Sequence, residues 1–374
     1  MYGKSAVFSV VLSLCSLYVS AQQITDGRYQ PQIRISGFMD VFYVYDFNRP
    51  ETAYRHPFLF NHNRHNEFNL NLGLLTVAVE NARYRANLAL QTGTYAHDNY
   101  AAEPGILKNI FEANVGIALN KRHSLWLDAG ILPSHIGFES AVSADNPTLT
   151  RSLAAENSPY FLTGLRLTFN AGKTWDFAVI VCNGWQRIQR LRGNSLRSLG
   201  TRLTYRPTAR TMLNWSTFLG TDDPDIQRRM RYFNNFYGRF GLTDRISLMA
   251  GFDVGIQQHR KKSRRYDTWF APVIIGQYEV NEKWKAAVRA EYYGDRAGVI
   301  IPVEGTNGFR TSGWSCNIDY TPVPGMVCRL EGRWLNSPYS LWNDGDIMVN
   351  NNFFIGTSIA FGFSERIGPD HRKK

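Results

Sequence analysis

Hydrophobic and polar residues alternate along most of the chain between Ile33 and Phe363. In the segment 68–79, for example, every second residue from 70 to 74 is leucine, and the residues between them are Asn or Gly. Successive side chains of an extended chain point to opposite faces, so this period predicts strands with one apolar and one polar face. The predicted strands are 33–45, 68–79, 84–94, 110–119, 125–131, 161–169, 175–183, 196–206, 211–220, 231–239, 246–256, 268–280, 284–293, 309–321, 326–335 and 351–363.

The connections between these segments alternate between short and long. The short ones are rich in Asn, Gly, Pro and Asp, as tight hairpins require. Short turns at one end and long loops at the other are typical of transmembrane barrels, whereas a soluble β-sandwich has no reason to separate them. Lipid offers no hydrogen-bond partners, so spanning strands must close into a ring. We therefore predict an all-β fold: a transmembrane antiparallel up-and-down β-barrel of about sixteen strands. The segments 125–131 and 231–239 alternate least clearly, which leaves fourteen or eighteen strands open.

The N-terminal residues predict that the protein is exported. Lys4 precedes an apolar run from Ala6 to Val19, and small residues follow at Ser20 and Ala21. This order is typical of a cleaved signal peptide, here residues 1–21. We expect a short periplasmic segment at 22–32, the barrel at 33–363 in the outer membrane, and a charged tail at 364–374.

The longest connection, 132–160, is the third of the long loops. Within it, Asn146-Pro147 reads as a helix N-cap followed by proline at the first helical position, which predicts a short helix from Thr148 to Glu156. A sixteen-stranded barrel encloses a water-filled lumen. We expect this loop to fold inward and constrict the lumen; a surface position outside the barrel is the alternative. The charged residues assigned to this constriction are Glu139, Asp145, Arg151 and Glu156.

The polar faces of the strands carry eight basic and seven acidic residues, a nearly balanced set of charges, and eleven of these residues are assigned to the lumen wall as candidate site residues. These residues are Arg34, Asp40, Arg85, Glu112, Arg166, Arg202, Arg289, Glu291, Arg329, Glu331 and Arg333. One hypothesis is that Glu139, Asp145 and Glu156 of the loop face Arg166, Arg202 and Arg289 of the wall. Such an arrangement would set up a transverse field across the pore. The alternative is that the lumen charges pair with one another and select nothing.

The chain has a formal net charge of +11, and the surplus lies in loops, turns and the tail. It is concentrated at Arg187, Arg190 and Arg192 and in the run 259–265. Nucleic-acid binding is excluded, because no stacking aromatics are interleaved with these cations. Three interpretations stay open: docking to lipopolysaccharide phosphates, a funnel for anionic solutes, or a solvated charged loop.

No motif indicates an enzyme, a metal site or a cofactor. Neither G-x-S-x-G nor H-E-x-x-H nor a phosphate-binding glycine loop occurs. His56, His62 and His65 in the first long loop have spacings that suit no zinc motif, so a solvated cluster is favoured over a metal site. For Cys316 and Cys328, two small apolar residues on the lipid face are favoured over a cross-strand disulfide.

Several short motifs, taken in order, resemble a known family. They begin with Ile35-Ser36-Gly37-Phe38 in the first strand and end with Arg329-Leu330-Glu331-Gly332-Arg333. The most specific block joins Ala129-Gly130-Ile131 to Ile136-Gly137-Phe138-Glu139 across the start of the third loop. With these motifs, residues 33–363 resemble the OmpL-like β-barrel porins of diderm bacteria.

The resemblance implies an outer-membrane channel. We expect passive diffusion of small hydrophilic solutes, a weak preference for anions, and contact with outer-membrane lipid and lipopolysaccharide. A homotrimer is expected by analogy with other sixteen-stranded porins. A non-transporting barrel that acts as an adhesin or a structural surface protein is the alternative.

Overall fold

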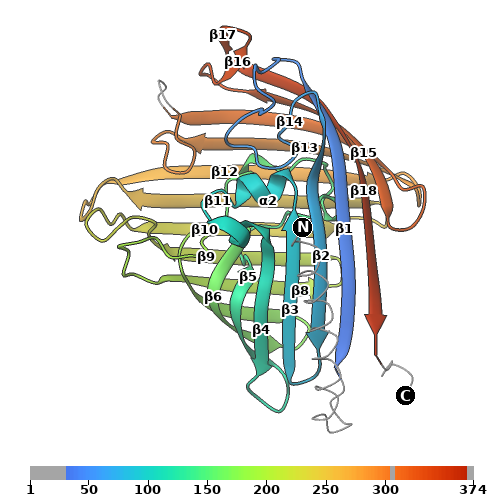
Figure 1. Cartoon of the computed structure of the whole chain (residues 1–374), viewed down its shortest axis with the longest axis vertical. Coiled ribbons are helices and arrows are strands. Elements are labelled where there is room, and N and C mark those ends of the chain that lie inside the picture. Colours follow the sequence, from blue (N-terminus) through green and yellow to red (C-terminus); the bar gives the residue numbers. More distant parts are fainter. Residues whose placement is uncertain (1–30, 304–307, 369–374) are drawn as a thin grey trace, which may run out of the picture.

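The computed structural model describes residues 31–303 and 308–368, which form one β-barrel (Figure 1). The signal peptide predicted at 1–21 lies outside the described residues, as do positions 22–30 and 369–374.

Sixteen strands of the described residues close into a ring in which each strand is antiparallel to its neighbours. The ring closes because β1 pairs with β2 on one side and with β18 on the other. The wall strands are β1 (Gln32–Asp46), β2 (Phe68–Glu80), β3 (Tyr84–Thr92), β4 (Ile110–Ala118), β5 (Leu125–Pro133), β6 (Phe161–Ala171), β7 (Trp175–Cys182), β8 (Ser198–Thr208), β9 (Thr211–Gly220), β10 (Arg231–Gly241), β11 (Ile246–Gln258), β12 (Tyr266–Glu279), β13 (Trp284–Asp295), β14 (Phe309–Tyr320), β15 (Met326–Asn336) and β18 (Asn351–Ile367). The predicted barrel and its strand number are confirmed.

The two segments with the least clear alternation, β5 and β10, are full members of the wall. The last strand differs from the prediction because it continues past Phe363 to Ile367. Its extra residues pair with the start of β1, as in the pairs Ile33–Ile367 and Ser36–Ser364. Unpaired backbone groups at the start of β1 explain why the pairing continues there.

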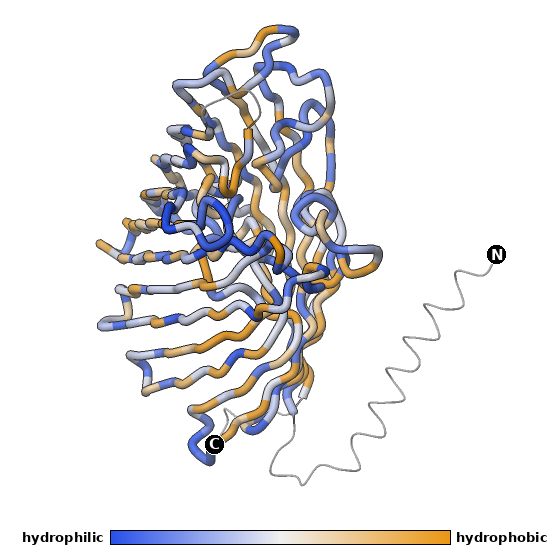
Figure 2. The backbone as a smooth tube through the Cα atoms, turned by 90° about the vertical axis from the view of Figure 1, so that its left-hand side faces the viewer, coloured by the Kyte–Doolittle hydropathy of each residue, from blue (hydrophilic) through white to orange (hydrophobic). Residues whose placement is uncertain are grey.

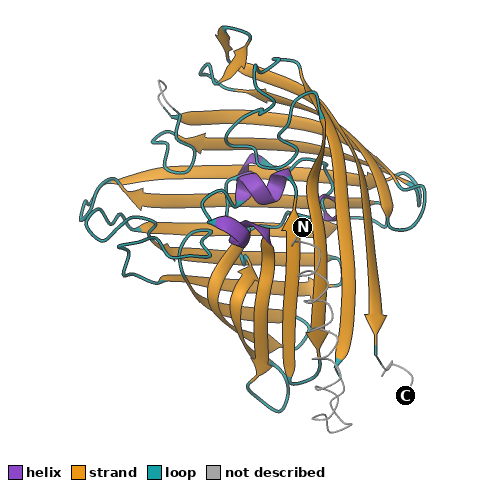
Figure 3. Ribbon diagram, viewed as in Figure 1, coloured by secondary structure: helices purple, strands orange, loops and turns teal. Residues whose placement is uncertain are grey.

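The remaining elements are small and belong to the long loops. A two-stranded hairpin, β16 (Trp342–Asp344) with β17 (Ile347–Val349), projects from the last loop at the top of Figure 1. The helices are α2 (Thr94–Asn99), η2 (Gly105–Asn109), η3 (Ser143–Asp145) and α3 (Leu153–Glu156). Figure 3 shows the helices within the ring of strands. No described helix is long and apolar enough to cross a membrane.

The outer face of the wall is apolar. Figure 2 shows hydrophobic and hydrophilic positions alternating along the strands. The outward residues include Val115, Val288 and Trp314, with 61%, 58% and 58% of their surfaces exposed. An exposed apolar band of this extent is a lipid-facing surface. Near the short turns, Trp284 stacks on Tyr320 with ring centroids 4.5 Å apart, as the interfacial aromatic girdle requires.

The interior is packed more densely than a simple water-filled barrel. Inward-facing Phe218, Phe233 and Trp269 form a buried apolar cluster with loop residues, among them Phe58 and Leu153. The long loops therefore fold into the barrel mouth and bury their own apolar side chains there. Cys182, Cys316 and Cys328 are free, and Cys316 is exposed on the outer face, so the disulfide alternative does not apply.

Candidate functional site

The third long loop lies inside the barrel, as predicted. It connects β5 to β6 and crosses the lumen to the wall formed by β13, β14 and β15. Its helix begins later than predicted, because α3 covers only Leu153–Glu156 and its N-cap is Ser152, whose hydroxyl accepts a hydrogen bond from Ala155 N at 3.2 Å. Asn146 is not the N-cap of this helix; its side chain bonds the backbone N and O of Ser140 at 2.7 and 2.8 Å.

Arg329 of β15 holds the first half of this loop. Its guanidinium donates to the carbonyl oxygens of Ser143, at 2.5 Å, and Asn146, at 2.8 Å. The same group donates to Asp319 of β14 at 2.8 Å. The predicted wall cation therefore serves as an anchor for the loop backbone, with its charge balanced by the neighbouring strand.

Arg289 and Glu331 hold the middle of the loop. Glu331 accepts hydrogen bonds from the backbone N of Thr150 at 2.6 Å and from its hydroxyl at 2.8 Å. Arg289 donates to Thr148 and Thr150 and reaches Glu331 at 3.0 Å. Both charged side chains are fully buried. Buried charges are tolerated only when they are paired and hydrogen-bonded, as they are here.

Glu291 and Arg333 hold the start of α3. Glu291 accepts from Leu153 N at 2.6 Å, so a wall carboxylate lies at the first turn of the helix. Arg333 donates to Glu291 at 2.6 Å and to the carbonyl of Arg151 at 3.1 Å. All five predicted wall charges of β13 and β15 thus contact the constriction loop or its anchors.

The charged residues of the loop itself are distributed differently from the hypothesis of a transverse field. Glu139 accepts from Ser152 N at 3.1 Å and lies 4.0 Å from Arg289, and burial raises the pKa of its carboxyl. Glu156 pairs with Arg151 of the same loop at 3.1 Å, and both are buried. Only Asp145 is exposed.

The wall arginines Arg166 and Arg202 do not face the loop carboxylates, which corrects that hypothesis. Arg166 pairs with Asp128 at 3.3 Å and Arg202 with Asp176 at 2.5 Å. Each partner lies on the adjacent strand. Both arginines therefore already have a carboxylate partner in the wall and do not pair with the carboxylates of the loop. Arg85 also binds Asp128, at 2.6 Å, so that two arginines share one carboxylate.

The remaining predicted wall residues lie on β1 and β4. Arg34 is exposed near the short-turn end and has no acidic partner among the described residues. Glu112 is half-buried, and its carboxylate accepts from Asn114 at 3.5 Å. Asp40 is buried and links three elements: it lies 2.8 Å from His62 of the first loop and accepts from Ser143 at 2.7 Å and Asn71 at 3.3 Å.

The first long loop also folds inward, although its sequence did not lead us to predict this. Arg55 donates to Asp46 at 3.1 Å, and burial lowers the pKa of His56, which lies 3.7 Å from the same carboxylate. His62 is buried and His56 and His65 are half-buried, so the three loop histidines are not the solvated cluster that was favoured. The sequence feature that could have predicted this inward course is a pair of acids, Asp40 and Asp46. They lie on the polar face of the first strand, and the loop that follows carries basic residues.

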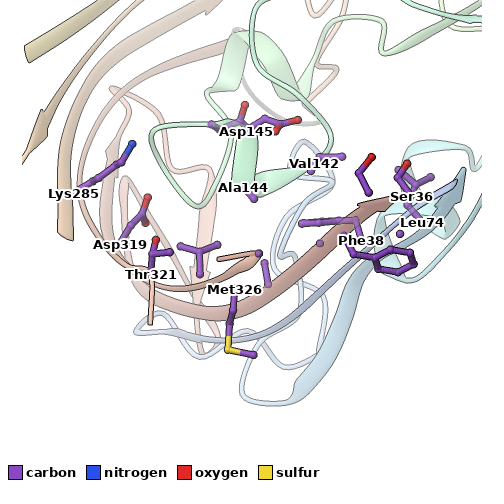
Figure 4. Close-up of a pocket in the computed structure, with 18 of the residues that line it drawn as sticks. Ser36, Phe38, Leu74, Val142, Ala144, Asp145, Lys285, Asp319, Thr321 and Met326 are labelled. Carbon is purple, nitrogen blue, oxygen red and sulfur yellow. The ribbon is translucent and has the colours of Figure 1, made fainter. Parts of the chain in front are cut away.

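Two cavities lined by both polar and apolar residues lie beneath the third loop. The larger, of about 680 Å³, is roofed by Val142, Ala144 and Asp145 of the loop (Figure 4). Lys285 and Asp319 lie on one side of it and Ser36 on the other. A second cavity of about 420 Å³ shares Leu74, Thr76 and Val142 with the first, and its wall includes Arg239.

The mouth on the long-loop side holds a third cavity. It measures about 570 Å³ and lies between the first, second and last long loops, with Tyr54, Phe60 and Asp98 in its lining. No group of three or more His, Cys, Asp or Glu side chains that could hold a metal ion is found in the part of the chain that the structure describes.

Solved porins share this fold. The anion-selective porin from Comamonas acidovorans aligns with a TM-score of 0.61 and 7% identity over 89% of this chain and 100% of that one. The outer membrane channel DcaP of Acinetobacter baumannii has a TM-score of 0.57 and 12% identity, covering 89% and 97%. OmpF of Salmonella typhi, in complex with daunomycin, has a TM-score of 0.59 and 9% identity, covering 88% and 97%. At these identities the likeness shows the fold alone.

The sequence itself assigns the family. A search of the curated proteins found no match. The family model described as "Putative beta-barrel porin-2, OmpL-like" matches residues 32–363, which is nearly the whole barrel. Its family and fold are those of outer-membrane channels rather than of enzymes. The chain therefore belongs to the OmpL-like β-barrel porin family.

Proposed function

We propose that this porin passes small hydrophilic solutes by passive diffusion through a narrow lumen, with a weak preference for anions. The observation that supports this most directly is the third loop, which is anchored inside a closed barrel above a cavity of about 680 Å³ whose lining includes Asp145, Lys285 and Asp319. A loop held across a lumen narrows it without adding a catalytic or binding step. Homotrimeric assembly stays a prediction.

The pore should be small for a sixteen-stranded barrel. The first and third loops bury Phe58, Phe138 and Leu153 against inward wall residues, so protein fills much of the mouth. The same observation favours the second candidate, a non-transporting barrel with an adhesive or structural role. Conductance separates the two, because only a porin opens an ion pathway.

The weak anion preference rests on wall cations whose charge is not fully balanced by acidic residues. Arg34 and Arg239 are exposed and have no acidic partner among the described residues, and Arg85 and Arg166 share one carboxylate. On the acidic side, Glu139 and Asp319 are balanced by Arg289 and Arg329. A small positive excess around the open cavities concentrates anions.

The test is single-channel recording of the refolded mature protein in planar bilayers under a salt gradient. We expect discrete openings of low conductance, with a reversal potential that indicates a slight excess of anion current. Replacing Arg34 and Arg239 by Gln should move the reversal potential toward cations. Arg210→Gln, in an exposed turn pair, is the control and should leave it unchanged. Folded protein that stays silent at all voltages and salt concentrations would refute the porin proposal.

A further inference from the structure

Three long loops on one side of the barrel mouth form a strongly basic surface. They connect β7 to β8, β9 to β10 and β11 to β12, and we call the surface made by residues 187–197, 221–230 and 259–265 the basic rim. Its acids are all engaged in pairs. Asp223 binds Arg229 at 2.8 Å, and Asp225 binds Arg228.

The loops of the basic rim are joined to one another. Asp225 N donates to the carbonyl of Gly193 at 2.8 Å, which connects the second loop to the first. Lys261 Nζ donates to the carbonyl of Asp225 at 2.6 Å, which connects the third loop to the second. The cations are therefore held on one surface, which argues against three independently solvated loops.

Six cations of the basic rim are exposed and have no ion-pair partner in the ranges 31–303 and 308–368. They are Arg192, Arg197, Arg260, Lys262, Arg264 and Arg265. The rest of the same mouth has a mixed charge, with exposed Arg49 and Arg296 accompanied by exposed Asp344 and Asp346. The unbalanced charge is thus confined to the side above β7–β12.

The basic rim lies directly above the lipid-facing wall. Arg197 precedes β8 on the face shared with Leu199, which is 45% exposed to the surroundings of the barrel. Arg264 and Arg265 immediately precede Tyr266, and the ring of Tyr266 contacts that of Tyr232 with centroids 6.1 Å apart. Both tyrosines are exposed on the outer face, where aromatic residues mark the level of lipid headgroups. This position favours a ligand beside the barrel over a solute entering the lumen.

We propose that the basic rim binds the phosphate groups of the phosphorylated glycolipid of the outer leaflet, lipopolysaccharide. Guanidinium groups match phosphate oxygens in geometry and charge, and five of the six unpaired cations are arginines. The lipid places its phosphates at the membrane surface, at the height of these side chains. The binding does not depend on conduction, so the proposal stands or falls separately from the channel.

The test uses the mature barrel in phosphatidylcholine nanodiscs, with lipid A that carries two phosphates as the probe and native mass spectrometry as the readout. We expect bound lipid A that is retained at low salt and lost at high salt. The triple variant Arg260→Gln, Lys262→Gln, Arg264→Gln should weaken the affinity at least about tenfold. Lipid A without its phosphates should bind the wild type as weakly as intact lipid A binds the triple variant.

A matched control separates a local site from overall charge. Arg49→Gln, Lys108→Gln, Arg296→Gln removes the same number of charges from long loops outside the basic rim and should keep wild-type affinity. Equal losses of affinity for lipid A in both triple variants would refute the proposal. Binding of dephosphorylated lipid A to the wild type with undiminished affinity would refute it as well. Full displacement of lipid A by an equal concentration of inorganic phosphate, or stronger binding of a soluble sulfated polysaccharide, would also overturn it. Conductance recorded in parallel should be the same for both triple variants.

Discussion

At the scale of single residues, His135 shows how tightly the third loop is seated. The residue follows β5, and its Nε2 donates to the carbonyl of Thr217 at 2.7 Å. Its ring lies over Gly200, where an added Cβ would come within 2.5 Å of Nε2. Burial, opposed by that hydrogen bond and assisted by Arg202 and Arg166, lowers the pKa of His135 to about 4. The imidazole is therefore neutral in the folded protein at neutral pH.

This pKa makes stability depend on pH in a defined window. Between about pH 6.5 and pH 4 the unfolded chain binds a proton at His135 that the folded protein does not, so the free energy of unfolding falls as the pH falls. The loss should approach about 3 kcal/mol below that window. Thermal unfolding midpoints at several pH values measure it. His135→Gln keeps an N–H donor without titrating, so its midpoint should depend less on pH; identical curves would contradict the assignment.

At the scale of elements, the third loop behaves as part of the wall. Backbone N–H groups of Leu149, Thr150 and Leu153 donate to side chains of β14, β15 and β13, and its short α-helix, α3, is capped within the loop. Such a loop has lost most of its freedom to move, because each displacement would leave a buried charge unpaired. The constriction should therefore be a permanent feature of the lumen.

Glu331→Ala should release this loop. The substitution leaves Arg289 and the backbone N of Thr150 without a principal partner, and breaking a buried ion pair typically costs about 3–5 kcal/mol. We expect higher and noisier single-channel conductance, together with faster hydrogen exchange over residues 148–153. Asp244→Ala breaks the exposed pair with Arg210 and is the control, with an expected effect of about 0–1 kcal/mol. Unchanged exchange in Glu331→Ala would show that the loop is held by other contacts.

At the scale of the whole molecule, closure of the ring is what makes the barrel stable in lipid. β1 and β18 are paired from Ile33–Ile367 to Asp46–Phe354, so neither strand leaves an edge. Unpaired backbone groups cannot be hydrated within a bilayer, and a closed ring has none. The final residues of β18 should therefore contribute to the stability of the barrel as much as its central residues do.

Truncation after Phe363 tests this closure. It removes the partners of Ile33–Ser36 and should destabilise the barrel by a few kcal/mol, at roughly 1 kcal/mol for each hydrogen bond lost. The fraction that migrates as folded barrel on an unheated gel, followed against temperature, measures the effect. Truncation after Gly368 keeps every pair of β18 and is the control. Equal midpoints for the two truncations would mean that the pairing beyond Phe363 adds nothing.

Much of the barrel could be predicted because its determinants are local. The period of two marks each strand without reference to any other strand, and turn residues mark each hairpin. The prediction failed at the helix in the third loop, where Asn146-Pro147 suggested a start that Ser152 provides. Asn146 instead bonds Ser140 within the loop. A capping residue has several possible partners, and local sequence does not choose among them.

The sequence by itself determined the closed antiparallel barrel and its lipid-facing and inward faces. It favoured an inward course of the third loop and left a surface position open, and the contacts of that loop with the wall decided between the two. Only the tertiary structure decided which charges meet. Glu331 binds Thr150 across 181 residues of sequence, and Asp40 binds Ser143 across 103. Arg166 and Arg202 were expected to face the loop and instead pair with neighbouring strands. Strand patterns arise from the geometry of the chain itself, whereas ion pairs depend on distances that exist only once the loops have folded into the barrel.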